Sequence, residues 1–182
     1  MDKNKYAKEQ KIRRWILTIY GSKFFSFPFT FKFRIKKYQK HFNIGKNPII
    51  ENDVWIQRTH GLLGEITIGD RVLLARHVSI DYSGTVIIED DVWLSEGCQI
   101  HSHIHKLDET RLKRVKGNII PTKVILKKGC WVGANAIILP QVEEIGENSI
   151  VAAGAVITKK VPSNVVVAGN PAKVIKQLSH KK

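Results

Sequence analysis

Aliphatic side chains recur every six residues over most of this chain. Five groups of three residues keep the step, and the members of each group are Ile44, Ile50 and Ile56; Ile68, Leu74 and Ile80; Ile88, Leu94 and Ile100; Leu126, Val132 and Ile138; Ile145, Val151 and Ile157. A period of six fits neither the 3.6-residue turn of a helix nor a plain alternating strand. It predicts short strands joined by tight turns, three strands to a coil of 18 residues. Such coils stack at about 4.8 Å per layer, and each one buries the open face of its neighbour.

The interruptions of this period are as informative as the period itself. The step from Ile80 to Ile88 is eight residues and the step from Ile138 to Ile145 is seven, so each corner holds one or two extra residues. The step from Ile100 to Leu126 is 26 residues, which is one step of six plus about twenty inserted residues. A long excursion from a regular scaffold is a common place for function. We therefore expect a polar inserted loop over residues 101–123.

Positive charge is concentrated at the N-terminus. The 30 Lys and Arg residues exceed the 16 Asp and Glu residues by 14, and residues 1–46 alone contribute 13 basic and 2 acidic residues. A basic chain suggests nucleic acid, but no zinc-finger spacing, RNP-like segment or phosphate-binding glycine loop is present, so we expect no nucleic-acid partner. The segment around Arg13-Arg14-Trp15 and the phenylalanines of residues 24–33 suit an anionic membrane face. The plainer interpretation is a solvated helix and an edge strand that cap the core.

Other features favour a soluble protein of a reducing compartment. No apolar stretch approaches the ~18–20 residues of a membrane span, and no secretion signal is recognisable. The two cysteines, Cys98 and Cys130, each stand four residues after a lead aliphatic residue, in an inward-facing slot. We expect both to be buried small hydrophobes rather than nucleophiles. The expected location is the cytoplasm, with peripheral contact at the inner membrane face as an added hypothesis.

Three segments of the C-terminal half resemble a known family. They are Cys-Trp-Val-Gly-Ala-Asn-Ala-Ile-Ile-Leu-Pro at 130–140, Val-Ala-Ala-Gly-Ala-Val-Ile-Thr-Lys at 151–159 and Ala-Gly-Asn-Pro-Ala-Lys-Val-Ile at 168–175. This pattern is similar to that of the hexapeptide-repeat acyltransferases, and most similar to the branch of maltose, galactoside and polysaccharide O-acetyltransferases. The resemblance covers about residues 44–178. It implies a left-handed parallel β-helix, acetyl-CoA as co-substrate, and a homotrimer with sites between subunits.

The expected fold is therefore all-β, a left-handed parallel β-helix of about five triangular coils. The coils occupy residues 44–171 and carry the inserted loop 101–123. A basic, aromatic cap with helical and strand segments precedes them at residues 1–43. A short C-terminal helix and tail closes the chain at residues 172–182.

Acetyl transfer to a hydroxyl needs a base that takes the alcohol proton, and histidine suits this role near neutral pH. The resemblance places a catalytic histidine five residues past the lead aliphatic residue of the third block, which makes His105 the candidate. His103 is the second choice, because an alternating run is easily misplaced by two residues. Asp81 resembles a motif residue of the polysaccharide-modifying branch. It is predicted either to contact the acceptor or to close a turn.

The resemblance also predicts where acetyl-CoA lies. The pantetheine and nucleotide track comprises Trp131, Gly133, Ala134, Ala153, Thr158 and Lys159. Lys173 and Lys176 would share one face of the expected C-terminal helix and meet the nucleotide phosphates. No metal is expected.

The predicted function is O-acetylation of a sugar hydroxyl in the biosynthesis of a surface polysaccharide such as capsule, lipopolysaccharide or exopolysaccharide. The acceptor is a saccharide, with a lipid-linked form as a further hypothesis. An N-acetyltransferase acting on an amino sugar or other small amine stays open, because the same base serves both reactions. A zinc protein like the γ-class carbonic anhydrases is a weaker alternative, suggested by His77, His101, His103 and His105. Three of these four alternate within one segment, whereas the carbonic anhydrase site draws its ligands from separate coils.

Overall fold

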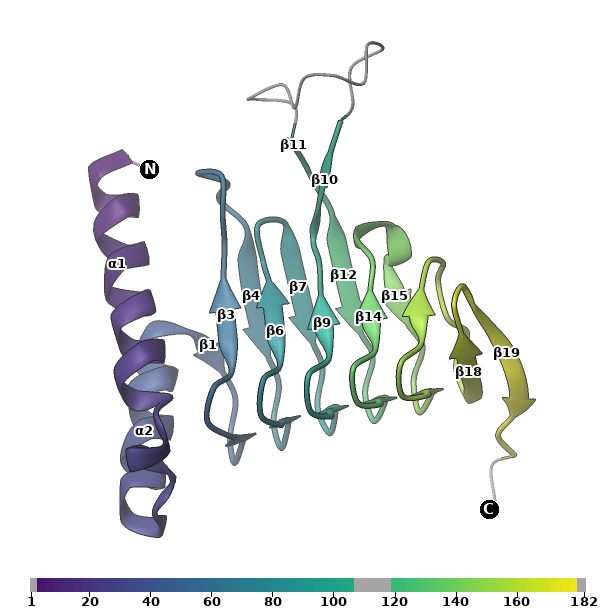
Figure 1. The fold of residues 1–182 in the computed structure, drawn as a ribbon, viewed down its shortest axis with the longest axis horizontal. Coiled ribbons are helices and arrows are strands. Elements are labelled where there is room, and N and C mark those ends of the chain that lie inside the picture. Colours follow the sequence, from purple (N-terminus) through teal and green to yellow (C-terminus); the bar gives the residue numbers. More distant parts are fainter. Residues whose placement is uncertain (1–2, 107–118, 180–182) are drawn as a thin grey trace.

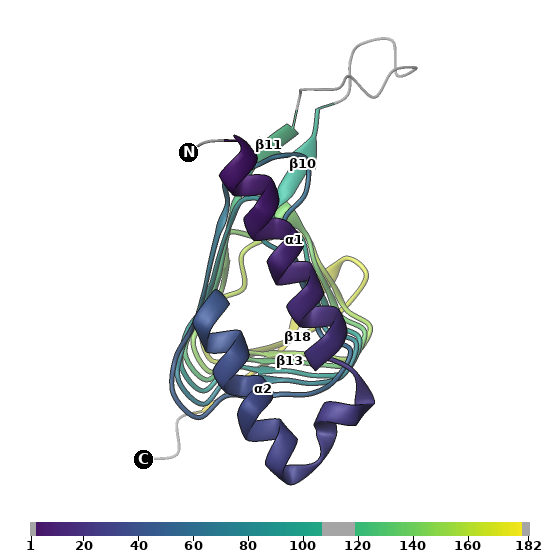
Figure 2. The same ribbon diagram turned by 90° about the vertical axis from the view of Figure 1, so that its left-hand side faces the viewer.

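The computed structural model describes residues 3–106 and 119–179, and in this part of the chain two α-helices precede a stack of short parallel strands (Figure 1). The helices are α1 (Lys3–Tyr20) and α2 (Pro28–His41), joined by the 3-10 turn η1 (Lys23–Ser26). Viewed along the stack, the coils form a triangle, and the two helices lie over its open end (Figure 2).

Three sheets form the three faces of the prism, and their strands run parallel except for the last strand of the second face. The first face comprises β1 (Asn43–Ile44), β4 (Glu65–Ile68), β7 (Thr85–Ile88), β12 (Lys123–Leu126) and β15 (Glu144–Ile145). The second face comprises β2 (Ile49–Ile50), β5 (Leu73–Leu74), β8 (Trp93–Leu94), β13 (Trp131–Val132), β16 (Ile150–Val151), β18 (Val165–Gly169) and β19 (Ala172–Gln177). The third face comprises β3 (Trp55–Gln57), β6 (Ser79–Asp81), β9 (Gln99–Ile100), β14 (Ile137–Ile138) and β17 (Val156–Ile157).

The register of these sheets stacks each lead aliphatic residue on its equivalent in the next coil. On the second face, for example, Leu74 pairs with both Ile50 and Leu94. The lead residues are at most 9% exposed and form one continuous apolar column. In the described residues the stack has five complete coils and part of a sixth, which confirms the coil architecture that the period of six predicts.

Cys98 and Cys130 lie in this column and are fully buried. Burial raises the pKa of each thiol to about 12, so both are neutral at physiological pH.

The corners between the first and second faces and between the second and third faces are regular. The third residue after each lead has a positive φ there, and these residues are Asn47, Asp53, Arg71, His77, Asp91, Gly97, Gly129, Asn135, Asn148, Gly154 and Asn164. At Gly97, with φ 71°, a Cβ would lie 2.3 Å from the Asn135 side-chain oxygen, so a larger residue would force that amide to shift. The regular spacing of the sequence therefore comes from these two corners.

The corner between the third and first faces collects every irregular step. Its segments are residues 57–64, 81–84, 101–106 with 119–122, 139–143, and 158–160, and we call it the site corner. The longest insertion leaves it as an antiparallel hairpin of β10 (His103–His105) and β11 (Ile119–Pro121), so its base is strand rather than the expected loop. The 3-10 turn η2 (Pro140–Val142) lies at the same corner.

The N-terminal cap differs from the sequence expectation in its second half. The alternating phenylalanines of residues 24–33 suggest a strand, but α2 is a helix. Pro28 begins it, and Arg34, Tyr38 and Phe42 point inward at a spacing of four residues. Nη2 of the buried Arg34 donates to the Ile50 carbonyl at 2.5 Å, which ties the helix to the first coil. None of the described helices has the length and apolarity needed to cross a membrane.

The predicted C-terminal helix is also wrong. Residues 172–177 form β19, which folds back antiparallel on β18. The edge of the last coil exposes unpaired backbone groups, and a returning strand satisfies them where a helix cannot. Lys173 pairs with Ala168 and Lys176 with Val166, with a bulge between them, so their relation is set by a strand and not by a helical face.

Candidate active site

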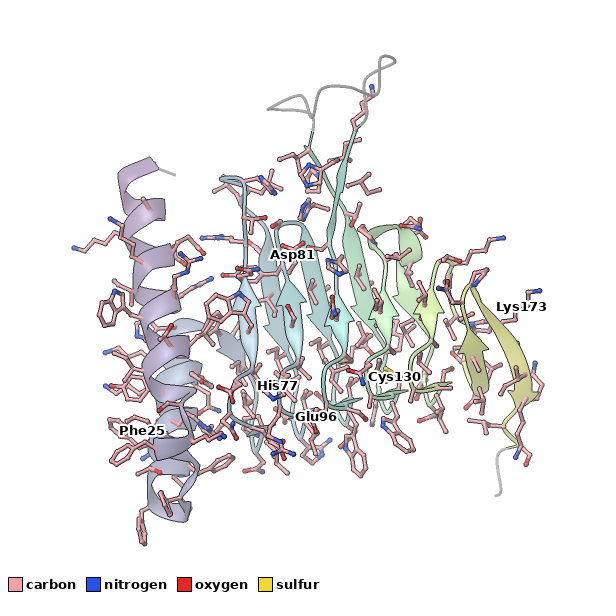
Figure 3. The ribbon with its side chains drawn as sticks, in the orientation of Figure 1. Phe25, His77, Asp81, Glu96, Cys130 and Lys173 are labelled. Atoms are coloured by element: carbon pink, nitrogen blue, oxygen red, sulfur yellow. The ribbon has the colours of Figure 1, made fainter. Side chains whose placement is uncertain are left out.

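Two neighbouring segments of the site corner bring a carboxylate against an imidazole. Asp81 ends β6, and β9 leads into the segment that holds His103, so the stacking of β6 on β9 places the two side by side. Nδ1 of His103 lies 2.6 Å from Oδ2 of Asp81. The two side chains are only 14% and 10% exposed. Figure 3 shows Asp81 at this edge, whereas His77 lies beside Glu96 at a different corner.

The carboxylate of Asp81 is held by further donors. Ser83 donates from its backbone N–H at 3.1 Å and from its hydroxyl at 2.5 Å, and the Ser102 N–H donates at 3.1 Å. Burial alone would raise the pKa of Asp81, but the hydrogen bonds from Ser83, Ser102 and His103 outweigh it, and the pKa is lowered. Asp81 is therefore ionised at neutral pH, and its carboxylate accepts a hydrogen bond from the protonated Nδ1 of His103.

A second imidazole continues this chain of contacts. Nε2 of His103 lies 3.1 Å from Nε2 of His105, whose side chain is exposed. With the Nδ1 proton of His103 directed at Asp81, its Nε2 is the acceptor, and His105 Nε2–H is the donor. The structure thus joins the two predicted histidines and Asp81 in one series. Both ring nitrogens of His103 are engaged inside it.

His60 is a residue of this cluster that the sequence analysis missed. Its ring centroid lies 5.1 Å from that of His103 and 4.9 Å from that of His105. It belongs to the loop after β3, where the step from Ile56 to Ile68 is twelve residues instead of six. This doubled step is the sequence feature that indicates an insertion at the corner. It does not indicate which residue of the insertion faces the histidines of another coil.

The other histidines considered in the sequence lie elsewhere. His101 precedes the hairpin, its backbone N–H donates to the Ile138 carbonyl, and burial lowers the pKa of its ring. His77 is 60% exposed and faces Glu96 at 4.0 Å. The four-histidine set of the zinc alternative is therefore not assembled within this chain.

Five of the eight predicted acetyl-CoA residues fall at two edges of the third face, and the other three, Trp131, Lys173 and Lys176, lie on strands of the second face. Gly133, Ala134 and Ala153 stack at the corner between the second and third faces, where a Cβ on Gly133 would lie 2.6 Å from the Ala153 nitrogen. Trp131 is 45% exposed beside them, and its Nε1–H donates to the Ser95 hydroxyl at 2.8 Å. Thr158 and Lys159 follow β17 at the site corner. Lys173 and Lys176 are exposed on β19, and Figure 3 labels Lys173 at that end of the stack.

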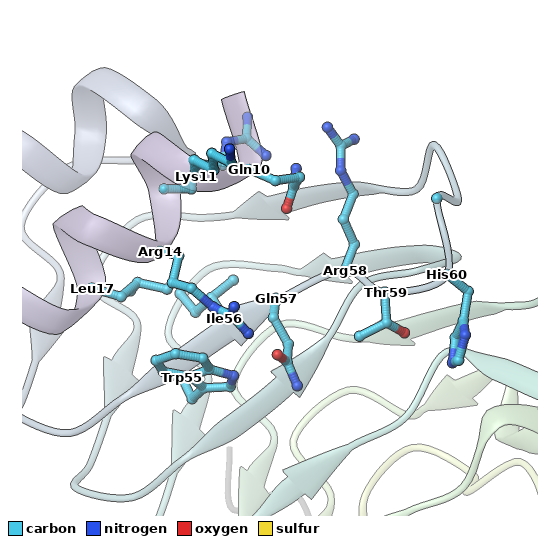
Figure 4. Close-up of a pocket in the computed structure, with 12 residues that line it drawn as sticks. Gln10, Lys11, Arg14, Leu17, Trp55, Ile56, Gln57, Arg58, Thr59 and His60 are labelled. Carbon is cyan, nitrogen blue, oxygen red and sulfur yellow. The ribbon is translucent and has the colours of Figure 1, made fainter. Parts of the chain in front are cut away.

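A basic pocket adjoins the histidine cluster (Figure 4). It lies between α1 and the loop after β3, has a volume of about 340 Å³, and is lined by Lys11, Arg13, Arg14 and Arg58 among others. The guanidinium of Arg14 lies 5.9 Å from the ring centroid of Trp55 in its wall. His60 also lines this pocket, so the pocket and the cluster share a side chain.

Comparison with known proteins gives a consistent group of relatives. No model of a known protein family matches the chain. Galactoside O-acetyltransferase of Escherichia coli strain K12 is 32% identical over 114 residues, which cover 63% of this chain and 45% of that enzyme. The chain spans only about half the length of the first curated relatives that it matches, 58% and 45%.

Solved structures match over more of the chain. A hexapeptide-repeat acetyltransferase of Vibrio cholerae aligns with a TM-score of 0.81 over 95% of this chain and 92% of that one, at 22% identity, and shows the fold alone. A maltose O-acetyltransferase of Clostridium difficile 630 has a TM-score of 0.79 at 25% identity, covering 96% and 88% of the two chains.

An N-acyltransferase of Bacillus cereus, solved with dTDP and 3-hydroxybutyryl-CoA, has a TM-score of 0.63 at 26% identity, covering 76% and 73%. The architecture confirms the left-handed β-helix expected from the resemblance. Together with the stacked coils, these likenesses support the resemblance to the hexapeptide-repeat acyltransferases, in sequence over 63% of this chain and in fold over 96% of it.

Proposed function

We propose that this protein transfers an acetyl group from acetyl-CoA to a hydroxyl of a saccharide. The observation that supports it most directly is the contact series Asp81, His103, His105 at the site corner. This series of contacts orients an imidazole. It lies beside the surface where the family resemblance places the thioester of acetyl-CoA. The E. coli relative is a galactoside O-acetyltransferase, which supports the hydroxyl acceptor.

His105 is proposed as the general base because its ring is exposed and reaches the solvent side of the cluster. It takes the proton of the acceptor hydroxyl as that oxygen attacks the thioester carbonyl. The C–S bond then breaks, and the departing sulfur takes the proton from the imidazolium, which leaves an acetyl ester and free CoA. Direct transfer between two bound substrates needs no covalent enzyme intermediate.

His103 and Asp81 are proposed as positioning residues behind this base. The ionised carboxylate orients His103, and the nitrogen of His103 that faces His105 stabilises positive charge forming on that ring. The buried carboxylate already holds four contacts from its own chain, which favours this role over contact with the acceptor.

Acetyl-CoA is proposed to lie along the third face between its two edges. The small residues Gly133, Ala134 and Ala153 leave room for an extended arm at one edge, and Thr158 and Lys159 stand at the other, which holds the base. Lys173 and Lys176 are proposed to meet the nucleotide phosphates from β19. The relative solved with an acyl-CoA supports this donor class.

The basic pocket is proposed as the acceptor site. Arg13 and Arg58 share the carboxylate of Glu9, and with Lys11 and Arg14 the pocket keeps a net positive charge, which favours a saccharide that carries phosphate. A nucleotide-linked or lipid-linked sugar meets that requirement and is consistent with surface polysaccharide biosynthesis. An amine acceptor is the second candidate, because the same base would serve it and because the Bacillus cereus neighbour is an N-acyltransferase.

The test is thiol release from acetyl-CoA against a panel of free sugars, amino sugars, nucleotide sugars and lipid-linked saccharides. Mass spectrometry of the product would distinguish an acetyl ester from an amide, because mild base removes only the ester. We expect thiol release with a phosphorylated saccharide. If calorimetry detects no acetyl-CoA binding and no acceptor raises thiol release above background hydrolysis, the proposal is wrong.

The cap is proposed to contact an anionic membrane face, which would bring a lipid-linked acceptor close. Its support is a set of exposed aromatic side chains among lysines and arginines: Trp15 at 66%, Phe24 at 69%, Phe27 at 60% and Phe29 at 85%. Rings of this kind sit at the membrane interface while cations meet lipid phosphates.

Vesicle flotation tests this contact. We expect the protein to float with vesicles that contain anionic lipid, and a variant with Phe24, Phe27 and Phe29 changed to Ser to stay in solution. Leu63→Ser is the control, because Leu63 is 59% exposed but lies in the loop after β3 and not in the cap. Equal flotation of the triple variant and the control would exclude this surface as the membrane contact.

A homotrimer is also proposed, with the β10–β11 hairpin as a contact between copies. The hairpin projects from the prism (Figure 1), and its paired residues Ile104 and Ile120 are 37% and 48% exposed. An apolar arm that leaves its own chain is better buried against another copy than in water.

A further inference from the structure

We propose that His60, His103 and His105 form a binding site for one Zn²⁺ ion. One ring nitrogen from each of the three side chains lies within 4.8 Å of the other two. Zinc binds imidazole nitrogens at about 2.0–2.1 Å in a tetrahedron, and nitrogens on such a tetrahedron are about 3.3 Å apart. The Nε2 atoms of His103 and His105 already lie 3.1 Å apart. Zinc would displace the proton that His105 shares with His103 in this contact, and the exposed side chain of His60 can move to complete the site.

The three rings converge instead of stacking. Their centroids are 4.9–5.1 Å apart and their planes cross at 65°, 71° and 85°. Edge-to-face packing is also an ordinary arrangement of aromatic rings. The observation that indicates a shared ligand is that each ring brings one nitrogen within 4.8 Å of the other two.

Asp81 contacts the ring nitrogen of His103 that faces away from the proposed zinc position, as carboxylates near metal sites often do. Its carboxylate lies 2.6 Å from Nδ1 of His103, which fixes the ring and leaves Nε2 directed into the cluster. A carboxylate behind a metal-binding histidine fixes the tautomer and raises the basicity of the coordinating nitrogen. Its negative charge also offsets part of the charge of the cationic pocket next to the site.

The loop that carries His60 is fastened to the same carboxylate. The Thr59 N–H donates to the Ser83 hydroxyl at 2.8 Å, and that hydroxyl donates to Asp81. All three histidines are therefore positioned by one hydrogen-bonded group, although they come from two coils. Three protein ligands leave a fourth coordination position open.

Zinc at this site would occupy a nitrogen of His105. On the basis of the proposed function, which makes His105 the base, bound zinc would inhibit acetyl transfer. The site itself does not depend on that activity and is tested without it.

The test is titration of the metal-free full chain with Zn²⁺ in a calorimeter, and with Co²⁺ followed by its visible absorption. The variants are His60→Asn and His77→Asn. The two histidines have nearly equal backbone conformations, φ 57° and 59°, and Asn tolerates positive φ, so the pair is matched.

We expect one zinc per chain for the parent and for His77→Asn, with the absorption of tetrahedral Co²⁺. We expect at least tenfold weaker binding for His60→Asn. Thermal melts of the metal-free variants check that both are folded. If the parent binds no zinc, or if His60→Asn binds it as the parent does, the site does not exist.

Thiol-release assays with and without zinc then separate the two proposals. A chain that binds zinc at this site but never transfers acetyl contradicts only the proposed function. A chain that transfers acetyl but binds no zinc contradicts only the metal site. Inhibition of the parent near its zinc dissociation constant, reversed by a chelator, supports both.

Discussion

Asp81, His103 and His105 have distinct environments, and these decide their proposed roles. The first two are nearly buried and engage each other, whereas His105 is exposed. We expect His105→Ala to lower kcat by about 10²–10⁴-fold, the usual contribution of a general base, with acetyl-CoA affinity retained. Steady-state thiol release and calorimetry measure the two quantities, and His77→Asn should keep the parental rate. If His105→Ala stays within a few-fold of the parent while His103→Ala is inactive, the base is His103.

At the scale of the element, each short strand is stable only because the coils on either side cover it. Leu94 on β8 is fully buried and pairs with Leu74 and Val132 in the neighbouring coils. We expect Leu94→Ala to lower the free energy of unfolding by about 2–5 kcal/mol, because the coils cannot collapse into the cavity. Leu63→Ala, at an exposed position, should change it by less than about 0.5 kcal/mol. Urea unfolding followed by circular dichroism measures both, and similar values for the two would contradict a tightly packed column.

For the whole molecule, the projecting hairpin and the exposed aromatic residues of the cap leave apolar surface outside the single-chain core. We expect light scattering to give three times the 20.7 kDa chain mass for the parent. We expect Ile104→Lys combined with Ile120→Lys to give a smaller species, because two charges would be buried at the contact. A monomeric parent at micromolar concentration would contradict the trimer. An unchanged trimer in the double variant would place its contact elsewhere.

The repeat of six predicts the coils because the information is local. Each strand needs one inward aliphatic residue and each regular corner needs a tight turn. The six-residue spacing of aliphatic residues therefore recurs in every block. The same locality explains why Cys98 and Cys130 can be assigned inward positions from spacing alone. It also explains why the widened steps mark the site corner, since any insertion there interrupts the count.

What only the tertiary structure decided are the contacts between blocks and the elements at the two ends. His60 and His105 come into contact because the stacked coils place loops of unequal length next to each other. The length of a loop does not tell which of its residues will face the neighbouring loop. Residues 28–41 form a helix because their inward side chains cover the first coil, although their phenylalanines alternate like a strand. Residues 172–177 form a strand because the last coil offers unpaired backbone groups. In each case the deciding partner lies in a distant part of the sequence, so the local pattern cannot contain it.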